Sequence, residues 1–537
     1  MAEIYDFIIV GAGPAGCAIA RRLAESPAQP SVLLVEAGGS NDETAHLSAA
    51  ERFNIAFREG SPLNWFYKTQ PQLKGQAIDY SRGKGLGGST AINFCGWVVG
   101  ADDDYNEWAR LVGDTAFGWD NVNRCMKKVE NFHDDVPAKF RKWFKPKSED
   151  HGIGGAVDVS YQQEWLDLCD DLYTAAEQVG FGVNPDVNNG NPIGMGIGTV
   201  CVYDGVRVTS ASAYLEGAPP NLTVKTGEHI EKVIFAGDAA SGVQTINGRG
   251  FTARKDVIVS AGALNTPQVL MLSGIGPREH LEDHEIPLIQ DLPEVGQNLQ
   301  DHCMSWAGIV VKKEHDQTIR QSPTPMGWMK VTATLNSEEF KMLPSEMQKY
   351  LSRPHVPNWE FACLTPFFDG MSLEPNEEIF SGLCMLMNPQ SRGTVLLRSA
   401  DPRDAPLIDP KFLTHPFDRR NAIEAMREML RYMQAPVWKR KTTRTLGWPK
   451  DDSDEAIWDT FSSNLRSSWH MCGTVRMGKD AASCTDTSFR VRGVGKLRVA
   501  DMSVCPLVPN NHTQTTAYVI GEIAAEKLIA EHGLDMA

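Results

Sequence analysis

The chain has 537 residues, of which 42% are hydrophobic and 22% are charged, and its formal net charge is −16. This length predicts two or three structural units, since domains usually hold about 100–200 residues. The acidic balance argues against nucleic-acid binding, which needs a face rich in Lys and Arg. No apolar run approaches the roughly 18 residues of a membrane span, and no secretory signal opens the chain, so we expect an intracellular, cytoplasmic protein.

The cysteines give no sign of a disulfide framework or a metal site. There are 11 of them, an odd number, and they are scattered without the paired spacing of zinc ligands. We therefore expect no bound metal.

The N-terminal segment predicts a strand, a glycine-rich turn, a helix and a second strand. Residues 5–10 are expected to form a buried strand, whose apolar run at 7–10 stops at Gly11, and the apolar run at 32–35 stops at Glu36. Gly11 permits a tight turn, Gly13 lets the backbone approach a pyrophosphate, and Gly16 allows the helix to pack closely on the strand. The helix N-terminus offers free N–H groups to phosphates.

Glu36 strengthens the prediction of a dinucleotide site, because an acidic side chain there accepts hydrogen bonds from ribose hydroxyls. The alternative is a glycine turn with no ligand, and the strand, the helix and Glu36 together argue against it. The pattern alone leaves FAD and NAD open, but the extended Gly-rich chain after Glu36 favours a flavin. The predicted contacts are Gly11, Gly13, Pro14, Ala15, Gly16, Glu36 and Ala37.

The remaining chain predicts a return to the same sheet and a second domain. Strand-like segments recur at 222–235 and 256–260, and the second, which is followed by residues 261–263, is expected to rejoin the nucleotide-binding sheet. From about 305 to 460 aromatic and Met residues increase, as in a substrate-facing domain. A last strand begins at Leu497, and a helix from about 514 to 531 has the apolar spacing Ala517, Ile520, Ala524, Leu528.

Further motifs identify a family resemblance that extends over nearly the whole chain and is weakest at about 310–380. The segment 82–93, RGKGLGGSTAIN, and the segment 262–276, GALNTPQVLMLSGIG, resemble the two signatures of the glucose–methanol–choline (GMC) oxidoreductases. The segments VGQNLQDH at 295–302 and LRVAD at 497–501 match as well.

The resemblance implies an α/β fold with a Rossmann-like FAD-binding domain, discontinuous in sequence, and an α+β substrate-binding domain with an antiparallel sheet. We assign residues 1–305 and 465–537 to the FAD-binding domain, with excursions into the other domain over about 150–200. Residues 306–464 supply most of the substrate-binding domain. The family's N-terminal and C-terminal regions correspond to about 5–305 and 390–530.

The resemblance also implies FAD as the cofactor. The glycines of the second Gly-rich segment allow the backbone to come close to the flavin. Relatives that tether FAD carry a histidine just before Asn93, where this chain has Ile92, so we expect noncovalent FAD. The further cofactor residues implied by the resemblance are Arg82, Gly87, Gly88, Ser89, Asn93, Val233, Asp501, His512, Thr513 and Gln514.

Two histidines are the candidate catalytic residues. Oxidation of an alcohol needs a base near neutral pH, for which His is suited. His470 matches the family's catalytic histidine, and His512 matches its second active-site position in the form typical of aryl-alcohol oxidases. We expect His470 to act as general base, with the hydride passing to flavin N5. His512 would hold the substrate oxygen and could share the role of base.

The substrate is not specified by these motifs. Aromatic side chains in the variable region favour a small aromatic or polyketide-like alcohol of secondary metabolism, although such residues are equally typical of a core. These are Trp306, Trp328, Trp359, Phe361, Phe367 and Phe368. The electron acceptor, O₂ or another molecule, stays open. The alternative function is a non-redox lyase or cyclase that retains FAD.

Cys95 and Cys472 lie close in sequence to Asn93 and His470. Either thiol could be near the flavin, but buried Cys most often acts as a small hydrophobe, which is the interpretation we prefer.

Overall fold

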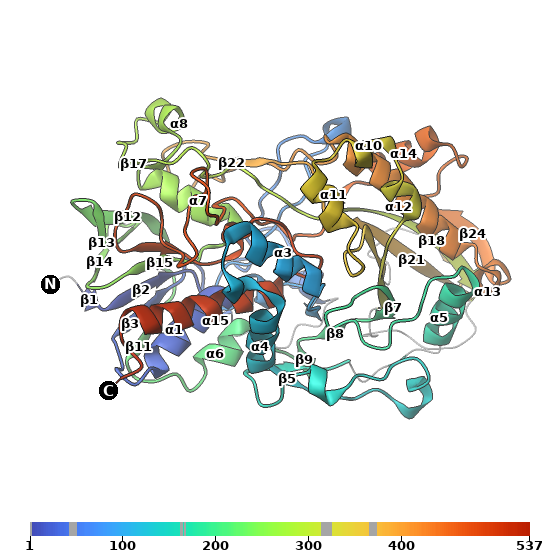
Figure 1. Cartoon of the computed structure of the whole chain (residues 1–537), viewed down its shortest axis with the longest axis horizontal. Coiled ribbons are helices and arrows are strands. Elements are labelled where there is room, and N and C mark those ends of the chain that lie inside the picture. The colour runs from blue at the N-terminus through green and yellow to red at the C-terminus, as the bar shows by residue number, and fades with distance from the viewer. Residues whose placement is uncertain are drawn as a thin grey trace.

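The computed structural model describes residues 3–41, 51–161, 165, 168–312, 325–364 and 373–536. A sheet of five parallel strands lies at the end of the molecule where both termini are found (Figure 1). Its strands follow the order β11-β3-β2-β15-β26. Their bounds are β2 (Phe7–Val10), β3 (Val32–Val35), β11 (Leu222–Lys225), β15 (Val257–Val259) and β26 (Leu497–Val499).

The order of these strands creates a crevice for a ligand. From one edge of the sheet to the other, these strands are the third, second, first, fourth and fifth in chain order. The direction in which the chain adds strands to the sheet therefore reverses between β2 and β15. Ligands of such sheets bind outside the carboxyl ends of the strands at this reversal. Strands β2, β3 and β15 are fully buried apolar runs, as parallel strands covered on both faces should be, and β26 is buried as well. The edge strand β11 is only partly buried.

A four-stranded sheet lies beside the parallel one and contains part of the strand-like segment 222–235. Residues 222–235 form two strands, β11 in the parallel sheet and β12 (Ile230–Ala236) in the second sheet. A turn at Gly227, whose φ is +72°, separates them. The second sheet has the order β1-β14-β13-β12, with β1 (Glu3–Tyr5), β13 (Ala239–Thr245) and β14 (Gly250–Ala253).

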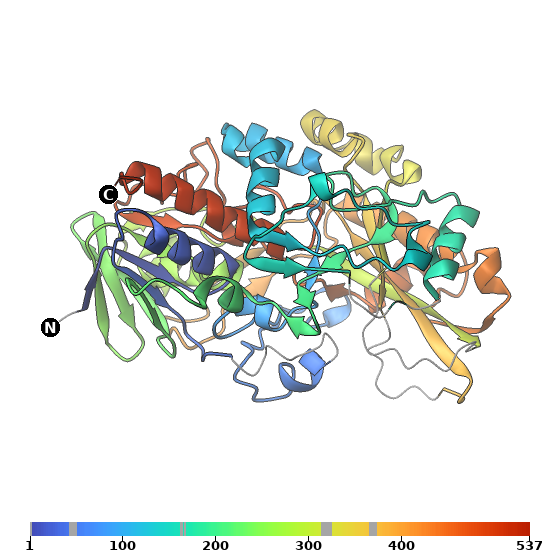
Figure 2. The ribbon, with the colours of Figure 1, turned by 90° about the horizontal axis from the view of Figure 1, so that it is seen from below.

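A sheet with antiparallel pairing forms the other end of the molecule, as Figure 2 shows from below. Its main order is β24-β18-β21-β20-β19-β7, and β25 also pairs with β18. The bounds are β7 (Gly194–Ile197), β18 (Cys303–Lys312), β19 (Pro325–Met329), β20 (Trp359–Leu364), β21 (Glu377–Leu386), β24 (Thr442–Leu446) and β25 (Arg466–Ser467). Strand β7 comes from the predicted excursion at 150–200. The domain division at residues 305 and 465 stays a prediction.

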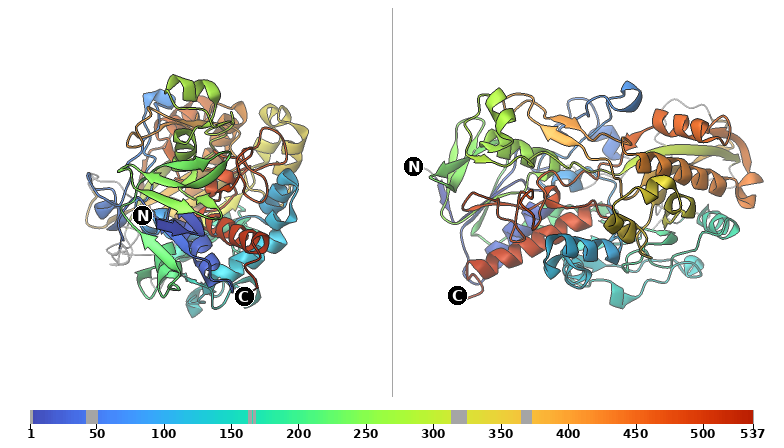
Figure 3. Two further views of the ribbon diagram at one scale, coloured as in Figure 1. Left: turned by 90° about the vertical axis from the view of Figure 1, so that its left-hand side faces the viewer. Right: turned by 45° about the horizontal axis from the view of Figure 1, so that its top comes forward.

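Two helices of the parallel-sheet half run side by side, as Figure 3 shows. These are α1 (Pro14–Glu25) and α15 (Gln514–Glu531). They approach so closely that a Cβ added to Gly521 would lie 2.7 Å from the carbonyl oxygen of Ala15. The sequence predicted one apolar face for α15, but residues 515–525 are all buried. The first part of the helix therefore lies inside the molecule, and its last residues reach the surface.

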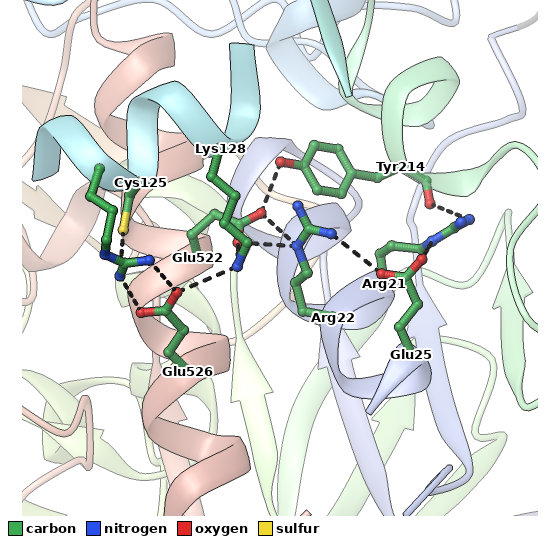
Figure 4. A network of polar contacts seen from close by, with 9 residues as sticks. Arg21, Arg22, Glu25, Cys125, Lys128, Tyr214, Glu522 and Glu526 are labelled. Atoms are coloured by element: carbon green, nitrogen blue, oxygen red, sulfur yellow. Dashed lines mark hydrogen bonds and ion pairs between the residues drawn. The ribbon is translucent and has the colours of Figure 1, made fainter. Parts of the chain in front are cut away.

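A buried carboxylate fixes α1 and α15 to their neighbours (Figure 4). Glu522 of α15 is fully buried and accepts hydrogen bonds from Arg22 Nε at 2.9 and 3.0 Å and from the Tyr214 hydroxyl at 3.0 Å. Lys128 Nζ of α4 lies 2.7 Å from its second oxygen. A buried charge is tolerated when it is paired in this way.

The other helices lie around these sheets. Their bounds are α2 (Glu51–Ile55), α3 (Asp102–Val112), α4 (Trp119–Val129), α5 (Leu168–Gln178), α6 (Ser210–Leu215), α7 (Gly262–Leu272), α8 (Arg278–Asp283), α9 (Thr332–Leu335), α10 (Glu338–Lys341), α11 (Ser345–Leu351), α12 (Pro416–Met433), α13 (Pro436–Lys439) and α14 (Asp454–Ser463). Among the described residues, no helix combines the length and apolar character needed to cross a bilayer.

Candidate active site

A cavity of about 540 Å³ lies between the carboxyl ends of the parallel strands and one face of the antiparallel sheet. Gly11 after β2, Glu36 after β3, Ala261 after β15 and Asp501 after β26 line one part. Residues of β18, β19, β20 and β21 line another. The volume is typical of sites for cofactors and small molecules.

The first glycine turn leaves room for a ligand at the start of α1. Gly11 has φ +102°, which favours glycine, and a Cβ added there would lie 2.5 Å from the Ser260 carbonyl oxygen. A Cβ on Gly13 would meet nothing within 4 Å, so its backbone faces open space. A Cβ on Gly16 would lie 2.0 Å from the Gly11 oxygen. The turn therefore combines close helix–strand packing with an open backbone at the helix N-terminus, where anions bind.

Glu36 joins the two Gly-rich segments. Its Oε2 accepts a hydrogen bond from the backbone N–H of Ala12 at 2.9 Å, and its Oε1 accepts from Gly38 at 2.9 Å and Gly85 at 3.0 Å. Burial raises the pKa of this carboxyl, and the backbone N–H groups oppose that shift. A carboxylate has about four lone-pair sites, so acceptor capacity for a ribose remains.

The second Gly-rich segment packs against the first. Gly88 has φ +51°, and a Cβ there would lie 2.9 Å from the Cα of Gly13. Farther along, Asn93 Nδ2 donates to Gln514 Oε1 at 3.0 Å, and Asn93 Oδ1 accepts from the buried Arg207 at 2.9 Å. These contacts fix Asn93 at the N-terminus of α15. Arg207 was not predicted, because it lies far from the motifs in sequence.

Most of the predicted cofactor residues lie on this one cavity. Those that line it are Gly11, Gly13, Pro14, Ala15, Glu36, Ala37, Arg82, Gly88, Ser89, Asn93, Asp501, His512, Thr513 and Gln514. Gly16 and Gly87 do not line it: Gly16 packs beneath the turn, and Gly87, with φ +89°, shapes the second segment. Val233 does not line it either. Its N–H donates to Ser273 Oγ at 2.9 Å, while Ile230 of the same strand reaches the cavity.

Two further predicted residues have partners inside the protein. Asp501 Oδ2 accepts from the N–H of Gly262 at 2.8 Å and from Thr266 Oγ1 at 2.5 Å, and so fixes the start of α7. Burial raises the pKa of this carboxyl. Arg82 is partly buried beside the cavity, and desolvation lowers the pKa of its guanidinium to about 10, which leaves it cationic at neutral pH.

The structure brings the two predicted catalytic histidines together. The ring centroids of His470 and His512 are 5.1 Å apart, and both rings line the cavity. The backbone N–H of His470 donates to Asp301 Oδ1 at 2.8 Å, and Ser467 Oγ donates to the other oxygen at 2.6 Å. Burial, with neighbouring cations and histidines, holds the pKa of His470 well below its usual value. His470 is therefore a neutral imidazole at neutral pH.

A third histidine is hydrogen-bonded to His470. The Nδ1 atoms of His302 and His470 are 3.0 Å apart, so one of them must carry the proton. Burial lowers the pKa of His302 to about 3, so that ring stays neutral. If His470 donates from Nδ1, its Nε2 keeps a lone pair for a substrate proton, and Nε2 has no partner among the described residues.

A buried glutamate orients His512. Glu360 of β20 is 0% exposed, and its Oε1 lies 2.9 Å from His512 Nε2. Its Oε2 has no hydrogen-bond partner among the described residues. A buried carboxylate with this single neighbour holds the proton of His512 on Nε2. Gly96 lies next to the other nitrogen, since a Cβ there would be 2.5 Å from His512 Nδ1.

Beyond the two histidines the cavity is mainly apolar. The side chains of the antiparallel sheet that line it include Met304, Trp306, Met326, Ala362, Ser381, Leu383 and Met385. Of the aromatic residues predicted for the pocket, only Trp306 lines it. Trp328, Trp359 and Phe361 are buried in the core, and Phe367 and Phe368 lie outside the described residues. Phe94 and Trp469, from other segments, line the cavity instead.

Cys95 and Cys472 are buried and do not line the cavity. This agrees with the preferred interpretation of both as small hydrophobes. All eleven cysteines are free thiols. In the described part of the chain, the one group of side chains that could hold a metal is Asp102, Asp103 and His355, away from the cavity and without a sign of a ligand.

Comparisons with known proteins agree with this arrangement. The models of the GMC oxidoreductase N-terminal and C-terminal regions match residues 5–304 and 389–521. An uncharacterised GMC-type oxidoreductase of Mycobacterium tuberculosis is 34% identical over 97% of this chain and 98% of its own length. An alcohol dehydrogenase [acceptor] of Pseudomonas putida is 33% identical over 99% and 97%. Versicolorin B synthase of Aspergillus parasiticus is 31% identical over 98% and 88%.

A solved structure of formate oxidase from Aspergillus oryzae has 27% sequence identity and a TM-score of 0.89, and each chain covers 99% of the other. The fold and the site thus define a nucleotide-binding oxidoreductase. The chain belongs to the GMC oxidoreductase family, whose members depend on FAD. The open backbone at Gly13, the helix N-terminus and the cavity volume fit that cofactor.

Proposed function

We propose that the protein oxidises the CH–OH group of a small, largely apolar alcohol. The observation that carries this proposal is the neutral His470, which lines the cavity with Nε2 unpartnered among the described residues and faces His512. Noncovalent FAD, held by the two Gly-rich segments and Glu36, would supply the hydride acceptor. Ile92 lines the cavity and has no nucleophile that could tether it.

The two histidines divide the work in this proposal. His470 takes the hydroxyl proton on Nε2, and its Nδ1–H continues to donate to His302, which stabilises the imidazolium. His512, oriented by Glu360 at Nε2, keeps a lone pair on Nδ1 and could share the role of base. The apolar wall of the antiparallel sheet excludes water from these groups and strengthens their interactions. The relative named as an alcohol dehydrogenase supports this reaction. A preference for aromatic alcohols and the identity of the electron acceptor stay predictions.

A non-redox lyase or cyclase is the second candidate, favoured by the relative named versicolorin B synthase. Two histidines can serve proton transfer alone. The two candidates differ in whether the substrate bleaches the flavin. A screen of aliphatic and aromatic alcohols under nitrogen, followed at the flavin absorbance, is expected to find bleaching by at least one of them. Substrate turnover with an unchanged flavin spectrum would favour the lyase or cyclase instead.

A further inference from the structure

A row of paired side chains crosses the antiparallel sheet, and Arg466, Met304 and Met385 of this row line the cavity. In the strand register Arg466 of β25 pairs with Met304 of β18, Met304 pairs with Met385 of β21, and Met385 pairs with Glu360 of β20. Directly paired residues of antiparallel strands lie on the same face. The row therefore leads from an arginine, across two methionines, to the carboxylate that orients His512.

Arg466 is the cationic end of this row. It lines the cavity and is exposed to solvent. Its Nη1 donates to the neighbouring carbonyl of Leu465 at 2.8 Å, and it forms no ion pair with a carboxylate of the described residues. Most other cavity-lining side chains of the sheet are apolar, so Arg466 is the fixed charge that this wall of the cavity offers to an anion. A guanidinium binds a carboxylate through two parallel N–H groups.

The spacing of the row sets the shape of the ligand. From Arg466 to Glu360 there are three strand spacings, which is about 14 Å between backbones. The Arg466 side chain takes up part of that distance. A molecule that spans the row has its hydroxyl group at His470 and His512, an apolar body against Met304 and Met385, and an anionic group at Arg466.

We propose that the substrate is an amphipathic alcohol with a carboxylate or similar anion at the end remote from the hydroxyl group, and that Arg466 binds this anion. The assignment rests on the proposed function for the hydroxyl end. The binding of the anion at Arg466 does not depend on the proposed function, because a carboxylate without any hydroxyl group should bind at Arg466 as well.

Octanoate therefore tests the anion site alone. Titration calorimetry of the holoenzyme is expected to show octanoate binding about tenfold more weakly to Arg466→Gln than to the wild type, as loss of one charge-assisted contact implies. Arg466→Lys should bind with intermediate affinity, and added salt should weaken wild-type binding, since the guanidinium is exposed. Arg278→Gln, which alters an exposed arginine of α8, is the matched control and should bind like the wild type. Equal affinities in the wild type and Arg466→Gln would overturn the proposal.

Substrates test the two ends together. In anaerobic flavin reduction, Arg466→Gln is expected to lose about tenfold in apparent second-order rate with ω-hydroxyoctanoate and nothing with octanol. Equal loss with both compounds, or no loss with either, would overturn the role of Arg466 in substrate choice. If neither compound bleaches the flavin while octanoate still separates the wild type from Arg466→Gln, the anion site stands and the proposed oxidation of such alcohols fails.

Discussion

At the residue scale, the burial of His470 has a direct consequence for pH dependence. Its pKa is held well below the usual value of His. Proton abstraction needs the neutral imidazole, which persists above the pKa and disappears below it. The rate of alcohol-dependent flavin reduction should therefore be level from alkaline pH down through pH 6.5, the ordinary pKa of His, and fall only in more acidic buffer. A profile that falls with a midpoint near pH 6.5 would show that His470 is not the base in this environment.

Gly96 offers a sharp test of the position of His512. An added Cβ would lie 2.5 Å from His512 Nδ1, and the backbone of Gly96 is not in the left-handed region, so Gly96→Ala acts through contact with the ring. We expect the displaced imidazole to lower the rate of flavin reduction by about 10²-fold, a loss that a misplacement of 1 Å can cause. Stopped-flow absorbance would measure it.

Gly250→Ala is the control for that variant, because a Cβ at Gly250 meets nothing within 4 Å. It should reduce its flavin at the wild-type rate with an unchanged thermal midpoint. If Gly96→Ala also keeps the wild-type rate, His512 does not need its observed position for the reaction.

The residues of the site were predictable where a local motif marks them. The glycine turn, Glu36 and the two histidines stand in short patterns, and these residues lie on one cavity. Glu360 and Arg466 could not be predicted, because strand register across β18, β20, β21 and β25 places them there. His302 lay within a recognised motif, but only folding brings its ring to His470.

At the element scale, a buried histidine joins segments outside the active site. His151 Nδ1 lies 3.3 Å from Glu130 Oε1, and its Nε2 lies 3.1 Å from Asp186 Oδ2. Although burial lowers the pKa of His151, these two carboxylates outweigh it and raise the pKa to about 10. The ring also stacks on Phe132, with centroids 3.7 Å apart. The imidazolium thus links β5 (Glu130–Phe132) to the loops at residues 151 and 186.

The folded pKa of His151 exceeds its unfolded value of about 6.5, so its contribution to stability is complete below pH 6.5 and declines as the pH rises toward 10. His151→Gln should lower the free energy of unfolding by about 3–5 kcal/mol at pH 6, because two buried carboxylates lose their cation. The deficit should shrink near pH 10. Urea unfolding at both pH values measures it, and an equal deficit at both would contradict a charged His151.

Elements were predicted best where their pattern is strictly local. The strand at 32–35 and the helix from 514 to 531 have the predicted bounds. The sheet to which the segment 222–235 belongs was harder to predict, because one turn divides the segment and its two halves lie in different sheets. The burial of residues 515–525 of α15 on all sides was not apparent from the spacing either, since it depends on the elements that surround the helix.

At the scale of the whole molecule, the chain builds one site from two structurally different halves. Helices α1 and α15, fixed together through Glu522, both begin at the cavity and present their N-termini to it. The antiparallel sheet closes the opposite side with an apolar wall. A cofactor held by the first half would meet a substrate held by the second, with His470 and His512 between them.

The anaerobic flavin spectrum after addition of an alcohol found by the screen tests this account most directly, with the wild type and His470→Ala measured side by side. We predict that the alcohol bleaches the wild-type flavin and that His470→Ala, with FAD still bound, reacts about 10²–10⁴-fold more slowly, the usual effect of removing a positioned base. A flavin that every alcohol leaves oxidised, or a His470→Ala variant that bleaches at the wild-type rate, would contradict it.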